Sequence, residues 1–258
     1  MKKIKLQSWN VNGIRAGIKK GFFDWLYQSQ PDILGLQETK IDAEKLTPEM
    51  THPEGYQTHW SHAEKKGYSG VALFSKLKPL SVCECLGVPE LDREGRVLLA
   101  DYGNFMLYNI YYPNGQRGDE RLQYKMDFYD AFLAHADKLK KKGKNLVICG
   151  DVNTAHKPID LARPKENEGT SGFLPIERAW MDKLISHGYI DTFRHIHPDA
   201  VDEYSWWNMR SRARERNVGW RIDYFFVSES LEKNIVDASI EQEVEGSDHC
   251  PVTLVLKF

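Results

Sequence analysis

Acid and amide side chains follow an apolar run near the middle of this sequence. Residues 146–149 are Leu, Val, Ile and Cys, and after Gly150 come Asp151 and Asn153. The run predicts a buried strand, and Gly150 is expected to let the chain turn where Asp151 emerges. If the backbone stays extended, Asp151 and Asn153 project to the same side. A carboxylate can bind a metal or move a proton, and a carboxamide can donate to a developing oxyanion. The pair therefore suits chemistry on a phosphate, and an Asx-type turn is the alternative.

The same arrangement recurs along the chain. Residues 3–9 alternate like a strand and end at Asn10 and Asn12, and the apolar residues 33–36 lead to Glu38. The similarity of residues 10–12 to residues 151–153 suggests an internal duplication. Other polar side chains at predicted strand ends are Tyr111, Asn114, Asp223, Asp248 and His249.

Separate strand ends on one rim can converge into a metal site. A hard cation such as Mg²⁺ prefers oxygen ligands and keeps several waters, so one or two carboxylates suffice. Glu38 and Asp248 are the candidates, helped by Asn10 or Asn12.

His249 is better suited to contact a phosphate oxygen or to move a proton than to bind Mg²⁺. Asp223 is expected to accept a hydrogen bond from the other ring nitrogen and so fix the tautomer. Taken singly, each of these acids has a surface or capping role as its alternative.

The elements that would position these groups are strands with helices between them. This pattern predicts a layered α/β fold with one catalytic edge. The irregular residues 154–174 form a loop long enough to indicate function. Helices are predicted over 21–30, 119–142 and 175–187, and further strands over 56–60, 70–74, 96–100, 105–112, 222–227, 235–240 and 251–256.

Composition limits the functional classes. The chain is 258 residues long, 41% hydrophobic and carries a net charge of -2, so any nucleic-acid surface must be a local basic patch. No linker divides the chain, which predicts a single domain over residues 1–258. No apolar run approaches the ~18 residues that span a bilayer and no signal peptide is present, so a cytoplasmic location is expected. The four cysteines lack zinc spacing and are interpreted as reduced, packed thiols.

Aromatic and basic side chains alternate over residues 204–221. Trp206 and Trp207 are followed by arginines at positions 210, 212, 214 and 216. This mixture suits a ligand with phosphates and an exposed sugar or base face. A core aromatic pair beside a solvated basic loop is the alternative.

Six segments together resemble one known family. They occur in the family's order over nearly the whole chain, and they resemble the signatures of the exonuclease III family of apurinic/apyrimidinic (AP) endonucleases. Gly172-Phe173-Leu174-Pro175 and Asn217-Val218-Gly219-Trp220 resemble its DNA-repair branch. The six segments are Trp9-Asn10-Val11-Asn12-Gly13, Leu36-Gln37-Glu38-Thr39-Lys40, Tyr112-Pro113-Asn114, residues 150–156, residues 217–224 and Gly246-Ser247-Asp248-His249-Cys250-Pro251.

The resemblance implies a four-layered α/β sandwich in which two mixed β-sheets pack face to face between helices. It implies Mg²⁺-dependent (or Mn²⁺-dependent) hydrolysis of the phosphodiester 5′ to an abasic site in duplex DNA, leaving a 3′-hydroxyl. It also implies 3′–5′ exonuclease or 3′-phosphodiesterase activity, a monomer, and association with the nucleoid during action on DNA. A phospholipid or inositol-phosphate phosphodiesterase of the same superfamily is the alternative, although it should lack the aromatic and basic stretch.

By resemblance, Asp151 orients or deprotonates the attacking water, or protonates the leaving group. Trp206 and Trp220 line a pocket for the flipped abasic sugar, together with Leu254 or its neighbours. The implied catalytic residues are Tyr111, Asp151, Asn153, Asp223 and His249; the implied metal-site residues are Asn10, Glu38, Asp151, Asn153, Asp248 and His249; the implied DNA contacts are Asn12, Asn114, Arg117, Asn167, Trp206, Arg210 and Trp220.

Overall fold

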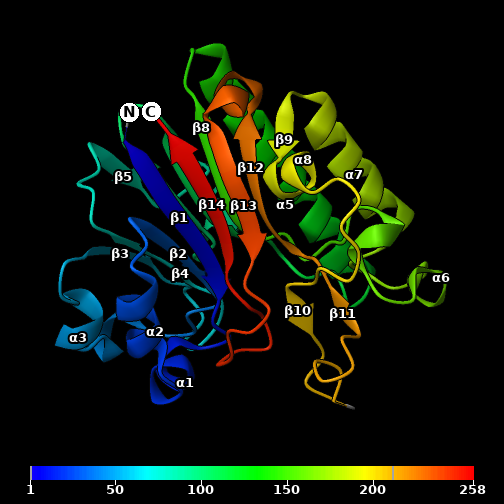
Figure 1. The fold of residues 1–258 in the computed structure, drawn as a ribbon, viewed down its shortest axis with the longest axis horizontal. Coiled ribbons are helices and arrows are strands. Elements are labelled where there is room, and N and C mark those ends of the chain that lie inside the picture. Colours follow the sequence, from blue (N-terminus) through cyan, green and yellow to red (C-terminus); the bar gives the residue numbers. More distant parts are fainter. Residues whose placement is uncertain (1, 211) are drawn as a thin grey trace.

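Two β-sheets form the centre of the molecule (Figure 1). The computed structural model describes residues 2–210 and 212–258, and within these residues each of the two sheets has six strands. Sheet A has the strand order β13 (Ile235–Ile240), β14 (Val252–Lys257), β1 (Lys3–Asn10), β2 (Ile33–Gln37), β4 (Val71–Ser75) and β3 (Gln57–Ser61). Sheet B has the order β5 (Ser81–Cys83), β6 (Val97–Asp101), β7 (Met106–Tyr111), β8 (Leu146–Asp151), β12 (Asp223–Ser228) and β9 (Tyr189–Asp191).

Helices cover the outer face of each sheet, which confirms the expected four-layered sandwich (Figure 1). No helix of the described part is long and apolar enough to cross a membrane. The helices are α1 (Ile14–Lys19), α2 (Phe22–Ser29), α3 (Pro48–Thr51), α4 (Pro89–Asp92), α5 (Asp119–Lys141), α6 (Pro164–Asn167), α7 (Pro175–Ser186) and α8 (Thr192–Ile196). Short 3₁₀ turns are η1 (Ala43–Lys45), η2 (Pro158–Asp160) and η3 (Glu229–Asn234), and a small hairpin consists of β10 (Trp206–Trp207) and β11 (Gly219–Trp220).

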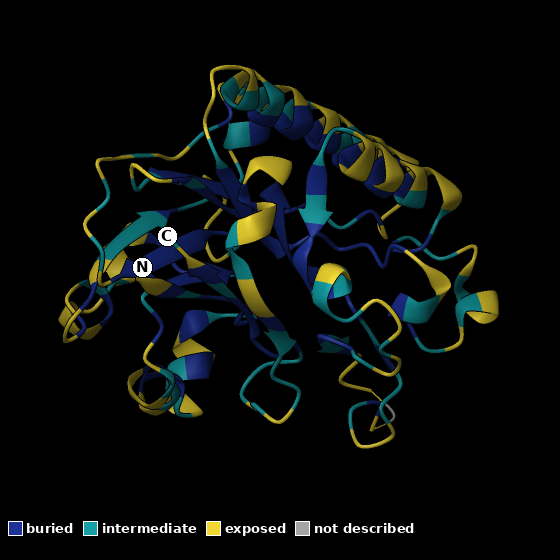
Figure 2. Ribbon diagram, turned by 45° about the horizontal axis from the view of Figure 1, so that its top comes forward, coloured by how far each residue is buried: buried dark blue, intermediate teal, exposed yellow. Residues whose placement is uncertain are grey.

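The long helix α5 illustrates how sequence dictates this layering. Acidic residues occupy its first turn and lysines its last turn, which suits the helix dipole. Phe128, Phe132 and Ala136 recur at helical spacing and are buried against the outer face of sheet B. The central strands are accordingly buried, whereas the outward faces of the flanking helices are exposed (Figure 2).

The inner faces of the two sheets meet in an apolar core crossed by a few polar side chains. Gln37 Nε2 donates to Asn109 Oδ1 (2.6 Å), and Asn109 Nδ2 donates to the carbonyl of Ala72 (2.7 Å), so hydrogen bonds join sheet B to sheet A. Gly35 allows this approach, because a Cβ there would lie 2.8 Å from Asn109 Oδ1. Cys149 is a buried free thiol, as expected, whereas Cys83 is exposed, so the expectation that it is packed is wrong.

Candidate active site and DNA-binding pocket

Strand register brings the polar strand ends together at one end of the sandwich. In sheet B, Asp151 of β8 is paired with Tyr111 of β7 on one side and with Asp223 of β12 on the other. In sheet A, Asn10 of β1 is paired with Gln37, directly before Glu38. Both sheets therefore contribute side chains to the same region.

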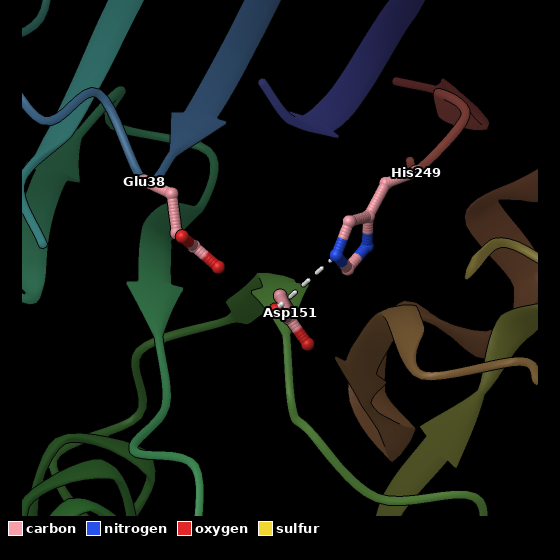
Figure 3. A group of neighbouring side chains, drawn as sticks. All are labelled: Glu38, Asp151 and His249. Carbon is pink, nitrogen blue, oxygen red and sulfur yellow. Dashed lines mark ion pairs between the residues drawn. The ribbon is translucent and has the colours of Figure 1, made fainter. Parts of the chain in front are cut away.

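Glu38, Asp151 and His249 point toward one another from separate elements (Figure 3). One ligand atom from each residue lies within 4.8 Å of the others. Among the described residues, these three form the group that could hold a metal ion. Asn10 Nδ2 bridges the two carboxylates, with 2.9 Å to Glu38 Oε1 and 2.9 Å to Asp151 Oδ2. Two converging carboxylates fit a hard divalent cation such as Mg²⁺, whereas an imidazole ligand is less typical of that ion.

Gly150 does not end the strand, so the turn expected there is wrong. It remains paired within sheet B, and a Cβ on it would lie 1.8 Å from the carbonyl oxygen of Ile110 in β7. The chain changes direction at Asn153, whose φ of 57° is left-handed. This turn still brings the Asn153 carboxamide to Asp151, with Nδ2 3.2 Å from Asp151 Oδ2, while Asn114 Nδ2 donates to Asn153 Oδ1 (3.0 Å).

The buried environment shifts the proton affinity of Asp151. Burial raises the pKa of its carboxyl group, and the neighbouring carboxylates of Asp223 and Glu38 raise it further, against the effect of His249. A carboxyl group with a raised pKa is suited to accepting or donating a proton near neutral pH.

Asp223 orients His249. His249 Nδ1 lies 2.8 Å from Asp223 Oδ2, which leaves Nε2 facing Asp151 Oδ2 at 3.9 Å. Burial alone would lower the pKa of His249, but the carboxylates of Asp223, Asp151 and Asp248 outweigh it and raise the pKa to about 10. The ring is therefore a charged donor at neutral pH, with its position set by Asp223.

Tyr111 lies next to the carboxylates. Burial and the nearby Glu38 carboxylate raise the pKa of its hydroxyl well above the usual value, so it is a proton donor in hydrogen bonds. The guanidinium of Arg96 stacks on its ring, with 4.5 Å from Cζ to the ring centroid.

Asp248 lies beside the cluster of Glu38, Asp151 and His249. Its Oδ1 accepts from Asn12 Nδ2 (2.9 Å), and its Oδ2 accepts from Trp206 Nε1 (3.1 Å). Burial would raise the pKa of Asp248, but the charge of His249 and these hydrogen bonds lower it. In this structure Asp248 connects the metal-site region to the aromatic pocket.

The hairpin β10–β11 forms a wall of the neighbouring pocket. Trp206 and Trp220 are paired across it and meet edge to face, with ring centroids 6.2 Å apart and planes at 85°. Gly172 packs against Trp220, because a Cβ on Gly172 would lie 3.1 Å from Trp220 Cζ3. The cavity has a volume of about 670 Å³, and its lining includes Asn12, Glu38, Tyr111, Asn114, Asn153, Asn167, Trp206, Arg210, Trp220, Asp248 and His249.

The expected pocket residue Leu254 lies elsewhere, and the expected DNA contact Arg117 lines a neighbouring cavity. Leu254 is fully buried in β14, where its neighbours across the sheet are Leu6 and Ala238, so the expectation that it lines the pocket is wrong. Ile222 lines the cavity instead. Arg117 lines an adjacent cavity of about 470 Å³ that also contacts Glu38 and Tyr111.

The arginines of the segment that connects β10 and β11 have different roles. Arg210 and Arg216 line the large cavity. Arg214 instead folds back, stacking on Trp207 at 4.6 Å and donating to the carbonyls of Gln242 (2.7 Å) and Val244 (2.6 Å). It therefore fixes the loop that leads to Asp248, rather than presenting its charge to a ligand.

Comparison with known proteins identifies the family. The model of the Endonuclease/Exonuclease/phosphatase family matches residues 8–249. The chain belongs to this family. An exodeoxyribonuclease of Bacillus subtilis (strain 168) is 47% identical over 99% of this chain and 100% of its own length. The DNA repair nuclease APEX1 of Danio rerio is 44% identical over 98% of this chain and 82% of its own. An AP endonuclease structure from Archaeoglobus fulgidus superimposes with a TM-score of 0.89 at 30% identity, covering 99% of this chain and 100% of that one.

Two residues that support the site were not predicted from the sequence. Ser205 Oγ donates to Asp223 Oδ2 (2.7 Å) and accepts from the amide nitrogens of Ile222 (3.0 Å) and Asp223 (3.0 Å). Arg96 is almost completely buried beneath Tyr111. The only sequence signal for either residue was its position directly before a run of other residues: Ser205 precedes two tryptophans, and Arg96 precedes an apolar strand.

Proposed function

We propose that this chain is a Mg²⁺-dependent endonuclease that cuts duplex DNA on the 5′ side of an abasic site and leaves a 3′-hydroxyl. The observation that carries this proposal is one cavity in which Glu38 and His249 lie beside the Trp206–Trp220 wall. The cluster suits hydrolysis of a phosphodiester, and the aromatic wall suits the sugar next to it.

Each residue of the site has its own role in the hydrolysis of the phosphodiester. In the hydrolysis, a water oxygen bonds to phosphorus, the bond from phosphorus to O3′ breaks, and O3′ takes a proton. Asp151 orients or deprotonates the water, or protonates O3′, and its raised pKa suits the two roles in which it exchanges a proton. Charged His249 and the Asn153 carboxamide donate to phosphate oxygens, and Tyr111 donates to a phosphate or leaving oxygen. A divalent cation held by Glu38, with Asp248 in the lining of the same cavity, would stabilise negative charge on the reacting phosphate.

The pocket supports selection of a sugar that has lost its base. Trp206 and Trp220 meet edge to face, and Phe173 packs edge-on against Trp220 at 6.5 Å between centroids, so the walls are rigid and apolar. In this proposal a normal nucleotide would be too large for the space beside the two rings, and extrusion costs least where base pairing is already lost. Arg210 and Arg216 on the rim suit the flanking phosphates.

The names of the relatives support the broader parts of the proposal. They include an exodeoxyribonuclease and a DNA repair nuclease, which supports DNA as the substrate and exonucleolytic hydrolysis as a further activity. We propose in addition that residues 1–258 act as one domain and as a monomer, and that the protein works in the cytoplasm on nucleoid DNA.

The test uses a duplex with a single tetrahydrofuran abasic analogue. Pure protein with Mg²⁺ should nick the strand directly 5′ to the analogue, and EDTA should abolish the nick. The undamaged duplex and inositol polyphosphates are the comparison substrates. Absence of a Mg²⁺-dependent nick, or faster release of phosphate from the inositol esters, would reject the proposal in favour of another activity of the family.

A further inference from the structure

A buried ion pair lies behind the site, between two helices of the outer layer. Lys125 of α5 and Glu177 of α7 are both 0% exposed, and Lys125 Nζ lies 2.6 Å from Glu177 Oε1. Removing two charges from water costs several kcal/mol per ion, and a well-packed apolar pair is often as stable. Stability alone therefore gives little reason to place a lysine and a glutamate there.

The hydrogen bonds of the pair lead to the active site. Lys125 Nζ also donates to the backbone carbonyl of Asn153 (2.8 Å) and to Thr154 Oγ1 (2.8 Å), so all three ammonium protons have acceptors. The lysine thus fixes the backbone at the left-handed turn that directs the Asn153 carboxamide toward Asp151.

The glutamate fixes the other side of the site. Glu177 Oε2 accepts from the amide nitrogens of Gly172 (2.6 Å) and Leu174 (3.0 Å), and its Oε1 accepts from Ser171 Oγ (2.8 Å). Gly172 is the residue that packs against the Trp220 ring. A backbone hydrogen bond from Ala155 N to Gly172 O (2.8 Å) joins the two segments directly.

We propose that Lys125 and Glu177 are positioning residues, which together set the distance between the Asn153 carboxamide and the Trp220 wall of the pocket. This inference rests on the proposed function, in which Asn153 contacts the scissile phosphate and Trp220 contacts the adjacent sugar. Lys125 binds the segment of Asn153, and Glu177 binds the segment of Gly172. Because Lys125 and Glu177 also bind each other, the ion pair joins the two segments into one rigid unit. A displacement near 1 Å at a reacting centre costs about 100-fold in rate.

The test compares Lys125→Met with Leu184→Ala in the full-length protein. Lys125→Met keeps the length of the side chain but removes its charge and donors. Leu184→Ala loosens α7, the helix of Glu177, at a fully buried position seven residues after Glu177 that does not line the cavity. Single-turnover cleavage and Kd are measured on the tetrahydrofuran duplex with Mg²⁺, together with Tm.

Lys125→Met should slow single-turnover cleavage about 10- to 100-fold while changing Kd less than about threefold. Leu184→Ala should lower Tm and leave the rate close to that of the wild type. Lys125→Arg retains a cation with donors and should recover most of the lost rate. Equal rates for Lys125→Met and Leu184→Ala would overturn the proposal. Glu177→Gln replaces Lys125→Met if the latter does not fold, and it should show the same slow cleavage.

Hydrogen exchange gives a readout that does not depend on cleavage. In Lys125→Met, amide exchange should accelerate at residues 152–155 and also at residues 170–174, whereas Leu184→Ala should leave both segments protected. Unchanged protection at both segments in Lys125→Met would also overturn the proposal. If the wild-type protein does not cut the abasic duplex, the proposed function fails, and the exchange comparison still decides whether the ion pair fixes these segments.

Discussion

Asp151 is a buried carboxylate whose oxygens already have hydrogen-bond donors. Its Oδ1 accepts from the amide of Asn153 (2.8 Å), and its Oδ2 accepts from Asn10 Nδ2 (2.9 Å). These contacts fix the carboxylate between Tyr111 and Asp223 on the neighbouring strands. A carboxylate held in this way can align water or exchange a proton without first reorganising.

Replacing Asp151 by Asn should separate binding from chemistry. The amide cannot exchange a proton in Asp151's place, and its NH₂ group would face donors from Asn10 or Asn153. We expect Asp151→Asn to retain affinity for the abasic duplex and to lose about 10²- to 10⁴-fold in single-turnover rate. Asp127→Asn makes the same chemical change at an exposed position of α5 and serves as the control. Unchanged turnover in Asp151→Asn would refute a chemical role for this residue.

At the scale of elements, a buried network of charges holds the segments that surround the pocket. Arg221 is fully buried, donating from Nε to Asp160 Oδ1 (2.9 Å) and from Nη2 to Asp191 Oδ2 (2.7 Å). Arg194 of α8 donates to the same Asp160 oxygen (2.7 Å). The network therefore joins η2, β9, α8 and the segment that leads into β12, two residues before Asp223, the partner of His249.

Acid should weaken this network in a defined range of pH. Burial would raise the pKa of Asp160, but Arg221 and Arg194 outweigh it and lower the pKa to about 2. The pKa of Asp160 in the folded protein lies below the value of about 3.9 in the unfolded chain. Ionised Asp160 therefore stabilises the fold above pH 4, and this stabilisation is lost as the pH falls toward 2. Urea unfolding should show Asp160→Asn less stable than wild type at pH 5, with the difference about 1 kcal/mol smaller at pH 3. A difference that does not change with pH would contradict this assignment.

Hydrophobic periodicity in the sequence predicted the long helices but not the shortest strands. The predicted helices over 21–30, 119–142 and 175–187 correspond to α2, α5 and α7, because each buries a continuous apolar face. The hairpin β10–β11 and strand β9 have two or three residues each, too few to show a period. Lys125 lies among buried residues of α5, and its role depends on Glu177, 52 positions away, a contact that local pattern does not reveal.

The placement of site residues was predictable where it depended on strand ends. Asp151, Glu38 and His249 converge because β-sheet register fixes where a strand terminates. The contact between Asp248 and Asn12 agrees with the expected metal site, whereas the donor from Trp206 was not predicted, because Trp206 lies in the hairpin β10–β11, 42 positions away. Leu254 was assigned to the pocket by resemblance alone, whereas it is buried in β14 between Leu6 of β1 and Ala238 of β13.

At the scale of the whole molecule, the two sheets repeat one arrangement. Each is centred on a parallel pair linked by helices, β1–β2 in sheet A and β7–β8 in sheet B, with antiparallel strands on both sides. In chain order β1 corresponds to β7, and β2 to β8. The similar residues 10–12 and 151–153 follow β1 and β8, which are not equivalent strands, so they do not mark the repeat. Glu38 and Asp151, however, stand at the ends of equivalent strands, and the site lies where the repeats face each other.

The spacing of the two sheets should therefore control both stability and catalysis, and Gly35 is the position at which to test this. A Cβ on Gly35 would lie 2.8 Å from Asn109 Oδ1 and 3.0 Å from Cys149 Sγ. Gly35 lies three residues before Glu38, and Cys149 lies two residues before Asp151. Accommodating it must move Asn109 and weaken its hydrogen bond from Gln37 Nε2 (2.6 Å). We expect Gly35→Ala to cost about 1–3 kcal/mol of unfolding free energy in urea.

The same substitution should slow cleavage of the abasic duplex by about tenfold or more, because separation of the sheets moves the Glu38 carboxylate away from Asp151. Gly169→Ala is the matched control: nothing lies within 4 Å of a Cβ at that position, so it should change unfolding free energy by less than about 0.5 kcal/mol. Loss of stability in Gly35→Ala with a full cleavage rate would show that the site tolerates a change in sheet spacing. A loss of both, absent from Gly169→Ala, would show that the contact between the sheets sets the geometry of the carboxylates.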